Sequence, residues 1–210
     1  MIVLALDTCL SACSAAVLAD DRVLAAASEP MVRGHQERLG GLVREVMTAS
    51  GIRFEDLDRI GVTVGPGSFT GLRVGLAFAK GLALATARPC VGVGSLEALA
   101  ASVEGSGRRI AVIDAGRGNV FVQAFEGGRA LMAPDNLPLE IAAARLAELG
   151  QGGVQLVGPG AHLLQGVMAA EAPAIAAPSP EAVARLAAAA PLTPPRPLYL
   201  RGPDARVKVA

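Results

Sequence analysis

Apolar residues gather along the chain in short runs that end at turn-forming residues, which is the pattern of buried β-strands. Three such runs open the sequence, and an acidic turn at Asp20 and Asp21 separates the second from the third, so we expect a hairpin there. Two further runs follow in the first half of the chain. The expected strands cover residues 2–6, 13–18, 23–27, 60–64 and 90–93.

Apolar residues at intervals of three and four predict two helices between these strands. The first helix covers residues 36–50 and places five apolar side chains on one face: Leu39, Leu42, Val43, Val46 and Met47. The second covers residues 72–86, where Arg73 and Lys80 share one narrow stripe and nearly every other residue is apolar or small. The second helix therefore has more apolar surface than one sheet can cover.

The two apolar faces of the helix over 72–86 are expected to serve different purposes. The face expected to pack on the sheet contains Val74, Phe78, Gly81, Leu82 and Ala85. The remaining face contains Leu72, Gly75, Leu76, Ala79 and Ala83. A helix that is apolar on two sides either lies deep inside a large protein or contacts a second chain. In a chain of 210 residues we favour the second chain.

The second half of the sequence begins with the same pattern as the first. A strand over 110–113 ends at Asp114 before a hairpin strand over 119–125, just as the strand over 2–6 ends at Asp7 before a hairpin. This repetition predicts a weak internal duplication. A helix over 139–149, a strand over 154–157, and helices from residue 162 and over 182–190 complete the pattern. We expect lobes over 1–105 and 106–190, followed by an irregular tail over 191–210 that contains five prolines.

Composition and charge argue against several classes of protein. Hydrophobic residues make up 52% of the chain, but no apolar run reaches the ~20 residues that span a bilayer. The first residues lack the basic segment of a signal peptide, so we expect a cytoplasmic protein without membrane contact. The 19 basic and 19 acidic residues balance, which leaves no broad surface for nucleic acid. Cys9, Cys13 and Cys90 lack zinc-binding spacing, and we expect reduced, buried thiols.

The stretch GPGSFTGLRVG over residues 65–75 joins an apolar strand to the most apolar helix. Its glycines allow sharp turns and close approach by another group, and Ser68 or Thr70 can cap the helix. The amide groups at the helix N-terminus then suit a phosphate or a carboxylate. A tight turn that binds nothing explains the stretch equally well, because the lysine and the serine or threonine of a P-loop are missing.

Other candidate chemistry is sparse. Asp7 and Asp114 end similar strands in the two lobes, as do aspartates that hold a metal nucleotide in phosphotransfer folds, although a strand-end aspartate is more often a turn residue. His35 and His162 are the only histidines and lie far apart, so we expect no metal site. The absence of a Gly-x-Ser-x-Gly motif argues against a serine hydrolase.

Several segments of the chain resemble the bacterial TsaB (YeaZ) family, whose members are required for the threonylcarbamoyladenosine modification of tRNA. The glycine stretch over 65–75 is the most specific of them, and together they span essentially the whole chain. The resemblance rests on LDT at 6–8, R-x-H-x-E-x-L at 33–39, GPGSFTGLRVG at 65–75 with AKGLA at 79–83, SLE-x-LA at 95–100, DA-x-R at 114–117 and PLYLR at 197–201.

The resemblance implies an α/β protein with the actin-like, Hsp70-like ATPase (ASKHA) fold, in which two ribonuclease H-like lobes have mixed sheets. It also implies a non-catalytic subunit in the synthesis of N6-threonylcarbamoyladenosine at adenosine 37 of tRNA (t6A37). Such a subunit scaffolds the transferase TsaD, a member of the glycoprotease-like M22 family, together with the ATPase TsaE. It forms a homodimer in isolation and meets tRNA only through the complex. No cofactor is expected on this subunit, since ATP, magnesium and metal belong to TsaD and TsaE.

The resemblance also suggests site residues. The expected partner interface comprises His35, Leu39, Leu42, Val43, Val46, Leu72, Gly75, Leu76, Ala79 and Ala83. A vestigial nucleotide site is expected at Asp7, Thr8, Gly67, Ser68 and Asp114. No catalytic or metal-binding residue is expected, because the His-x3-His motif of TsaD is missing. Gly158-Pro159-Gly160 also replaces the Gly-Gly turn that binds adenosine, and proline there removes a donor amide.

Two alternatives stay open. One is a degenerate ATP-binding or M22 peptidase-like enzyme that acts through Asp7, Asp114 and the glycine stretch. The other is direct tRNA binding by the basic tail residues Arg196, Arg201, Arg206 and Lys208, although four charges at a chain end are more often simply solvated.

Overall fold

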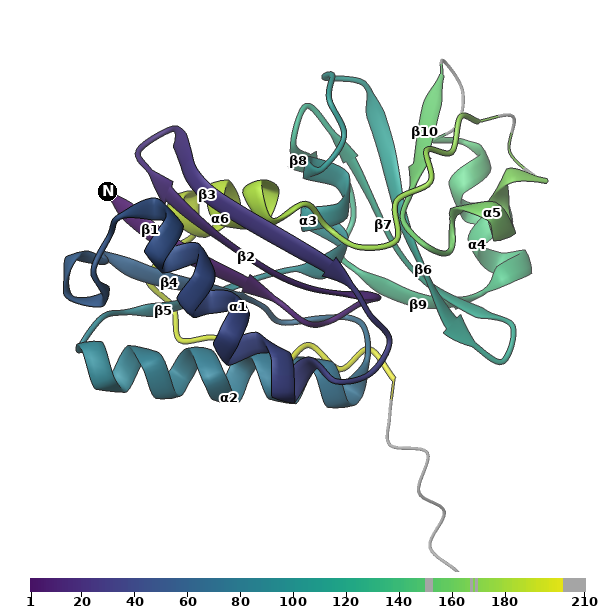
Figure 1. Ribbon diagram of the computed structural model, residues 1–210. Helices are drawn as coiled ribbons and strands as arrows, with labels where there is room; N and C mark the ends of the chain where they lie inside the picture. Colours follow the sequence, from purple (N-terminus) through teal and green to yellow (C-terminus); the bar gives the residue numbers. More distant parts are fainter. Residues whose placement is uncertain (150–152, 167, 169, 202–210) are drawn as a thin grey trace, which may run out of the picture.

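The computed structural model describes residues 1–149, 153–166, 168 and 170–201. It has two lobes that lie side by side, each built on a five-stranded sheet (Figure 1). The first half of the chain forms β1 (Ile2–Asp7), β2 (Ala12–Ala19), β3 (Arg22–Pro30), α1 (His35–Ser50), a short 3-10 helix (Phe54–Asp56), β4 (Arg59–Thr63), α2 (Phe69–Thr86), β5 (Cys90–Val93) and α3 (Ser95–Ala101). The second half forms β6 (Arg108–Gly116), β7 (Asn119–Glu126), β8 (Arg129–Ala130), β9 (Asp135–Pro138), α4 (Leu139–Ala147), β10 (Val154–Val157), α5 (Ala161–Gln165) and α6 (Pro180–Ala189).

The first sheet has the strand order β3-β2-β1-β4-β5. The first three strands are antiparallel, whereas β4 runs parallel to β1, and β5 runs parallel to β4. Helices α1 and α2 cover one face of this sheet and α6 covers the other. Leu4 and Leu6 belong to the core on the α1 and α2 side, and Val3 and Ala5 belong to the core under α6. Burial on both faces explains why the strands read as continuous apolar runs.

The second sheet repeats the arrangement of the first in shorter form. Its order is β10-β6-β7-β8, and β9 also pairs with β7. The hairpin of β6 and β7 corresponds to that of β1 and β2, and β10 runs parallel to β6 as β4 does to β1. The topology therefore supports the internal duplication that the sequence predicted.

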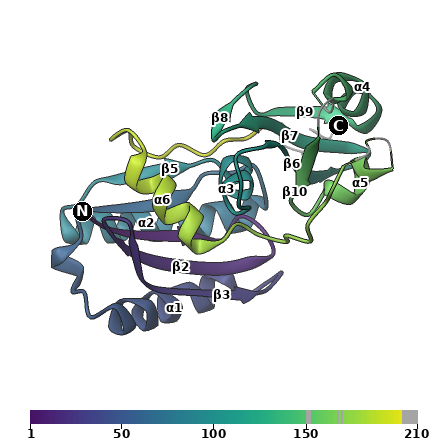
Figure 2. The same cartoon turned by 90° about the horizontal axis from the view of Figure 1, so that it is seen from above.

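Helices α3 and α6 each pack on the sheet formed by the other half of the sequence. α3 contacts β6 and β7, whereas α6 contacts β1, β2 and β4. In both views α3 lies between the lobes, and α6 lies against the first sheet (Figure 2). The expected lobe limits stay a prediction. Helix α6, however, packs on the sheet of the first lobe, whereas residues 106–190 were assigned to the second lobe. Its apolar stripe of Val183, Ala184 and Ala187 fits the sheet face that α1 and α2 leave open.

The helices and strands expected from the apolar pattern are confirmed, and their ends differ by a few residues at most sites. The sequence missed β8 and β9, because their residues, RA and DNLP, contain no run of apolar side chains. Within the described residues, no helix is both long and apolar enough to cross a membrane.

Candidate functional site

The expected assignment of the two faces of α2 is reversed in the structure. The face buried against the sheet contains Leu72, Gly75, Leu76 and Ala79, which were expected to face a partner. Gly75 explains this orientation, because a Cβ atom at that position would lie 2.5 Å from Oγ1 of Thr8. The sequence could not separate the faces, since both are apolar. The small residues mark the side that approaches the sheet most closely.

Nine of the ten residues expected at the partner interface are therefore enclosed within the chain. The enclosed residues are His35, Leu39, Leu42, Val43, Val46, Leu72, Gly75, Leu76 and Ala79. Only Ala83 is partly exposed. A docking surface on these two helices must use their outer sides instead.

A surface groove of about 550 Å³ lies between α1 and α2. It is lined by Gln36, Leu39, Phe69, Thr70, Arg73, Val74, Ala77 and Phe78. The ring of Phe78 lies over Gly40 of α1, where an added Cβ would be 3.6 Å from a ring carbon. Further along α2, Leu84 is 85% exposed. The outer side of α2 is thus accessible and presents apolar side chains together with the cations Arg73 and Lys80.

An aromatic cluster lies at the start of α2, where Phe69 and Arg73 line the groove. The ring centroids of Phe69 and Tyr199 are 5.4 Å apart, and Cζ of Arg73 lies 3.7 Å from the centroid of Phe69. Tyr199 reaches this position because the amide of Leu198 donates a 2.8 Å hydrogen bond to the carbonyl of Val64. The segment PLYLR over 197–201, which was noted only for its family resemblance, thus lies against the start of the glycine stretch.

The glycine stretch packs on the turn between β1 and β2. A Cβ atom on Gly67 would lie 2.3 Å from the carbonyl oxygen of Cys9, and one on Gly71 would lie 2.0 Å from that of Thr8. The amide of Ser68 donates to Cys9 O at 2.7 Å, and the amide of Gly71 donates to Ser68 Oγ at 3.2 Å. The glycines are therefore required for close backbone packing, and several amide donors of the loop are already used.

The two strand-end aspartates lie in different environments. Asp7 is fully buried, and its Oδ1 accepts hydrogen bonds from Thr63 Oγ1 at 2.5 Å and from the amide of Cys9 at 3.0 Å. Burial raises the pKa of Asp7, although the hydrogen bond from Thr63 opposes the shift. Asp114 is exposed, and its Oδ1 accepts from the amide of Gly116 at 2.7 Å.

The expected nucleotide residues do not fit a magnesium nucleotide. Thr8 donates its hydroxyl to the carbonyl of Gly71 at 2.7 Å, and Asp7 is inaccessible. An apolar cluster fills the interface between the lobes, with contributions from Leu10, Leu96, Leu99, Ile113 and Leu200. A phosphate cradle needs unpaired amide groups and a metal needs reachable oxygen ligands. Across the residues that the structure describes, no group of three or more His, Cys, Asp or Glu side chains could hold a metal ion.

The remaining sequence predictions concern the cysteines and the tail. Cys9 and Cys13 are buried and unpaired, and burial raises the pKa of Cys9 to about 12 and that of Cys13 to about 11. Cys90 is also unpaired, but it is only half-buried, in contrast to the expectation. In the tail, Nη1 of Arg201 donates to the carbonyl of Ala115 at 2.7 Å. Arg206 and Lys208 lie outside the described residues, so the tail hypothesis stays untested.

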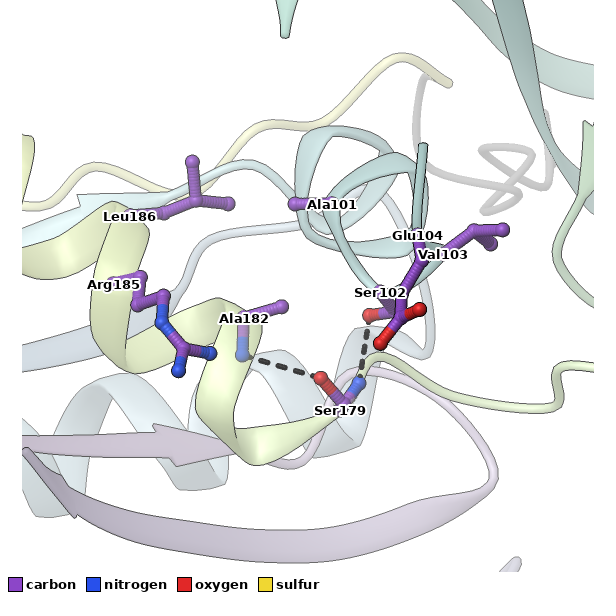
Figure 3. Close-up of a pocket in the computed structure, with 8 residues that line it drawn as sticks. All are labelled: Ala101, Ser102, Val103, Glu104, Ser179, Ala182, Arg185 and Leu186. Carbon is purple, nitrogen blue, oxygen red and sulfur yellow. Dashed lines mark hydrogen bonds between the residues drawn. The ribbon is translucent and has the colours of Figure 1, made fainter. Parts of the chain in front are cut away.

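A second hollow, of about 420 Å³, lies where the end of α3 meets the start of α6 (Figure 3). The amide of Ser179 donates to Ser102 Oγ at 2.8 Å, and Ser179 Oγ caps α6 by accepting from the amide of Ala182 at 3.2 Å. Glu104, which follows the end of α3, and Arg185 of α6 lie on opposite sides of the hollow. The bond between Ser179 and Ser102 joins the start of α6 to the end of α3. No pattern in the sequence predicted this contact, because the two serines lie 77 positions apart.

Comparison with known proteins places this geometry in a family. The family model described as TsaD, tRNA N6-adenosine threonylcarbamoyltransferase, matches residues 27–151. The tRNA threonylcarbamoyladenosine biosynthesis protein TsaB of Escherichia coli (strain K12) is 39% identical over 124 residues, which are 58% of this chain and 53% of that protein. The chain thus spans about half the length of this curated relative.

Solved structures extend the similarity to the whole chain. One is a Pseudomonas aeruginosa protein described as uncharacterized with similarity to peptidase YEAZ, which has a TM-score of 0.83 at 30% sequence identity. The alignment covers 95% of this chain and 99% of that protein. Component A of (R)-2-hydroxyglutaryl-CoA dehydratase from Acidaminococcus fermentans has a TM-score of 0.52 at 14% identity, over 90% of this chain and 96% of its own, which shows the fold alone. The two lobes have the actin-like ATPase fold. The chain belongs to the TsaB (YeaZ) family.

Proposed function

We propose that this chain is a non-catalytic subunit of t6A synthesis that binds a TsaD-like transferase through the groove between α1 and α2. The observation that carries the proposal is the groove itself, whose lining includes Phe69, which is 53% exposed, and the exposed Ala77. Further along α2, Leu84 is 85% exposed. Apolar surface that stays accessible along a groove marks an interaction site. The core beneath α2 is complete without these side chains.

The comparisons support a partner of the same fold. The TsaD family model spans residues 27–151, a range that includes both α1 and α2. Two proteins that share this helix pair can join them around a pseudo-two-fold axis, as symmetric dimers do with identical surfaces. The relative from E. coli is named for threonylcarbamoyladenosine biosynthesis. A transferase partner is the simplest explanation that joins the two observations.

The contacts of the glycine stretch and of Asp7 support the absence of catalysis in this subunit. Ser68 and Gly71 of the glycine stretch bind the turn between β1 and β2 through backbone groups. Asp7 Oδ1 accepts from Thr63 of β4 and from the amide of Cys9, which are contacts that support the fold. We therefore assign ATP, magnesium and metal to TsaD and TsaE, and no cofactor to this chain. We also propose that the subunit acts in the cytoplasm, meets tRNA only through the complex, and pairs with itself when TsaD is missing. No observation favours the alternative enzyme acting through Asp7 and Asp114.

A binding experiment tests the docking surface. Ala77 is exposed in the groove, so Ala77→Arg and Ala77→Glu both insert a large polar side chain there. We expect each change to weaken binding of the cognate TsaD by about tenfold or more in calorimetric titration, whichever charge is introduced. Ala144→Arg and Ala144→Glu are matched controls on the exposed side of α4 in the second lobe and should bind like the wild type.

A genetic experiment tests the role itself. In a strain depleted of its own TsaB, expression of this chain should restore t6A in total tRNA, measured by mass spectrometry of nucleosides. The Ala77 variants should restore less than the Ala144 variants. Normal t6A with the Ala77 variants, together with unchanged affinity for TsaD, would contradict the proposed surface.

A further inference from the structure

We infer that the docking surface extends from the helices onto the C-terminal segment, and that Phe69, Arg73 and Tyr199 form an anchor for acidic residues of the transferase. This inference rests on the proposed function and names the chemistry that the partner must present. Neither the groove nor the family similarity by itself assigns a role to Tyr199.

The composition of the cluster is unusual for this chain. The sequence has five phenylalanines, one tyrosine and no tryptophan. Two of these six rings, Phe69 and Tyr199, lie in contact at the surface with 53% and 47% exposure. Tyrosine, tryptophan and arginine are the residues most enriched at energetic centres of protein interfaces. The chain therefore concentrates its scarce aromatic surface beside the groove.

The anchor is held in place by both lobes. On one side of Tyr199, the amide of Leu198 binds the carbonyl of Val64 at 2.8 Å. On the other side, the carbonyl of Leu200 accepts from Asn136 Nδ2 at 3.3 Å, and the Leu200 side chain packs in the cluster between the lobes. Because the ring is already positioned, Tyr199 itself loses little conformational entropy when a partner binds there.

Charge on α2 points to an acidic partner. Arg73 and Lys80 are exposed on this helix, and its sequence from Phe69 to Thr86 contains no carboxylate. Neither cation forms an ion pair with any residue that the structure describes. On α1, by contrast, Arg38 is bound by Glu29 and Glu45 within 2.7 Å. Carboxylates of a partner are the groups that would neutralise the cations of α2.

The same charges favour a different protein over a second copy of this chain. In a two-fold contact, the same patch lies on both sides of the interface. Pairing α2 with α2 would then bring like charges together without a compensating carboxylate on that helix, which lowers affinity. A transferase whose helices carry aspartate or glutamate at this position avoids the repulsion.

Titration of the cognate TsaD into variants of the full chain tests the anchor. We expect Arg73→Glu to weaken binding by about a hundredfold and Tyr199→Ala by about tenfold, whereas Tyr199→Phe keeps the stacked ring and binds like the wild type. Arg129→Glu, an exposed charge reversal on β8 of the second lobe, is the matched control and should have no effect. Added salt should weaken wild-type binding more than binding by Arg73→Glu. Equal melting temperatures would show that the variants are folded.

The outcomes separate this inference from the proposed function. If the wild type does not bind TsaD, the proposed function fails. If the wild type binds and Ala77→Arg does not, but Arg73→Glu and Tyr199→Ala bind normally, the groove stands and the anchor is overturned. If sedimentation of the chain alone shows a homodimer that Arg73→Glu dissociates while TsaD affinity is unchanged, the anchor serves a second copy and the acidic transferase is overturned.

Discussion

Replacing Asp7 by asparagine tests whether this carboxyl group is structural or catalytic. In the fold, Asp7 ends β1 with no exposed surface, and its Oδ1 accepts from Thr63 and from the amide of Cys9. Asparagine has the same shape and can keep both hydrogen bonds through its carbonyl oxygen. It cannot ionise, however, so Asp7→Asn removes the ionisable group and leaves the accepted bonds intact.

The size of the effect follows from these contacts. Asp7→Ala would leave the amide of Cys9 and the hydroxyl of Thr63 without their acceptor, and each unsatisfied buried group costs about 1–3 kcal/mol. We therefore expect Asp7→Ala to lower the free energy of unfolding by about 2–5 kcal/mol. Asp7→Asn should leave it unchanged or raise it at neutral pH, because the desolvation of a charge is no longer required.

The pH dependence gives a sharper signature. Burial raises the pKa of Asp7 above its ordinary value of 3.8. Below that value the carboxyl group is protonated in both states, and its contribution to stability is fully present. As the pH rises above it, the unfolded chain releases the proton while the folded chain keeps it. The free energy of unfolding then falls by up to about 1.4 kcal/mol per pH unit until the pH passes the folded pKa. Asp7→Asn lacks this decline.

Urea denaturation of the wild type and both variants between about pH 5 and about pH 8 measures these differences. We expect the advantage of Asp7→Asn over the wild type to grow with pH across the window that lies above 3.8 and below the raised pKa. A constant difference, or an asparagine variant as unstable as the alanine variant, would refute the reasoning. Full t6A restoration by Asp7→Asn is also expected, whereas its loss in a folded, TsaD-binding variant would support the enzyme alternative.

Three further predictions concern the packing of α2, the end of α6 and the thiol of Cys9. Gly71→Ala should lower the free energy of unfolding by about 2 kcal/mol through overpacking, since its Cβ would lie 2.0 Å from a backbone oxygen. Gly81→Ala adds a methyl group that meets open space in the same helix, so it should raise the free energy of unfolding by about 0.5–1 kcal/mol. Thermal denaturation of both variants measures the two changes. Arg59→Met should lower the free energy of unfolding by about 2–3 kcal/mol and speed hydrogen exchange in α6, because Arg59 Nη1 binds three carbonyls at the end of α6. Arg44→Met is the exposed control, and unchanged exchange in α6 would count against the capping role. Cys9, whose pKa is raised to about 12, should resist iodoacetamide in the native protein and react only on unfolding, as mass spectrometry can measure.

The parts of the fold that follow local rules could be predicted from the sequence. Apolar runs and turn residues identified β1 to β5, and the aspartate after each first strand revealed the repeated topology. The orientation of α2 could not be predicted in the same way. Its two faces have similar polarity, and the deciding factor is the small space that Thr8 and Val62 leave around Gly71 and Gly75 of the helix. That space exists only once the turn between β1 and β2 has packed.

The candidate site was missed because its parts come from distant segments. Tyr199 lies 130 positions after Phe69, and no periodic pattern relates residues so far apart. The position of α6 was missed for the same reason, since the carbonyls that Arg59 binds lie at Ala187, Ala188 and Ala190. Two local signals did exist. The single tyrosine occurs in the PLYLR motif, and Arg73 and Lys80 form a stripe without a nearby carboxylate.

The packing between the lobes bears on the docking role that we propose for this chain. Domains joined by a polar, hydrated interface move relative to one another, whereas a large apolar interface holds them together. In this chain Leu10, Leu96 and Leu99 meet Ile113 and Phe121 in one apolar cluster, and Leu200 joins it from the C-terminal segment. Opening the lobes would expose that cluster to water and would also release the segment that positions Tyr199. If the docking surface proposed above is correct, this apolar interface supports it by holding the segment around Tyr199 in place. A polar substitution at Leu99 should then weaken TsaD binding in calorimetric titration without touching α1 or α2.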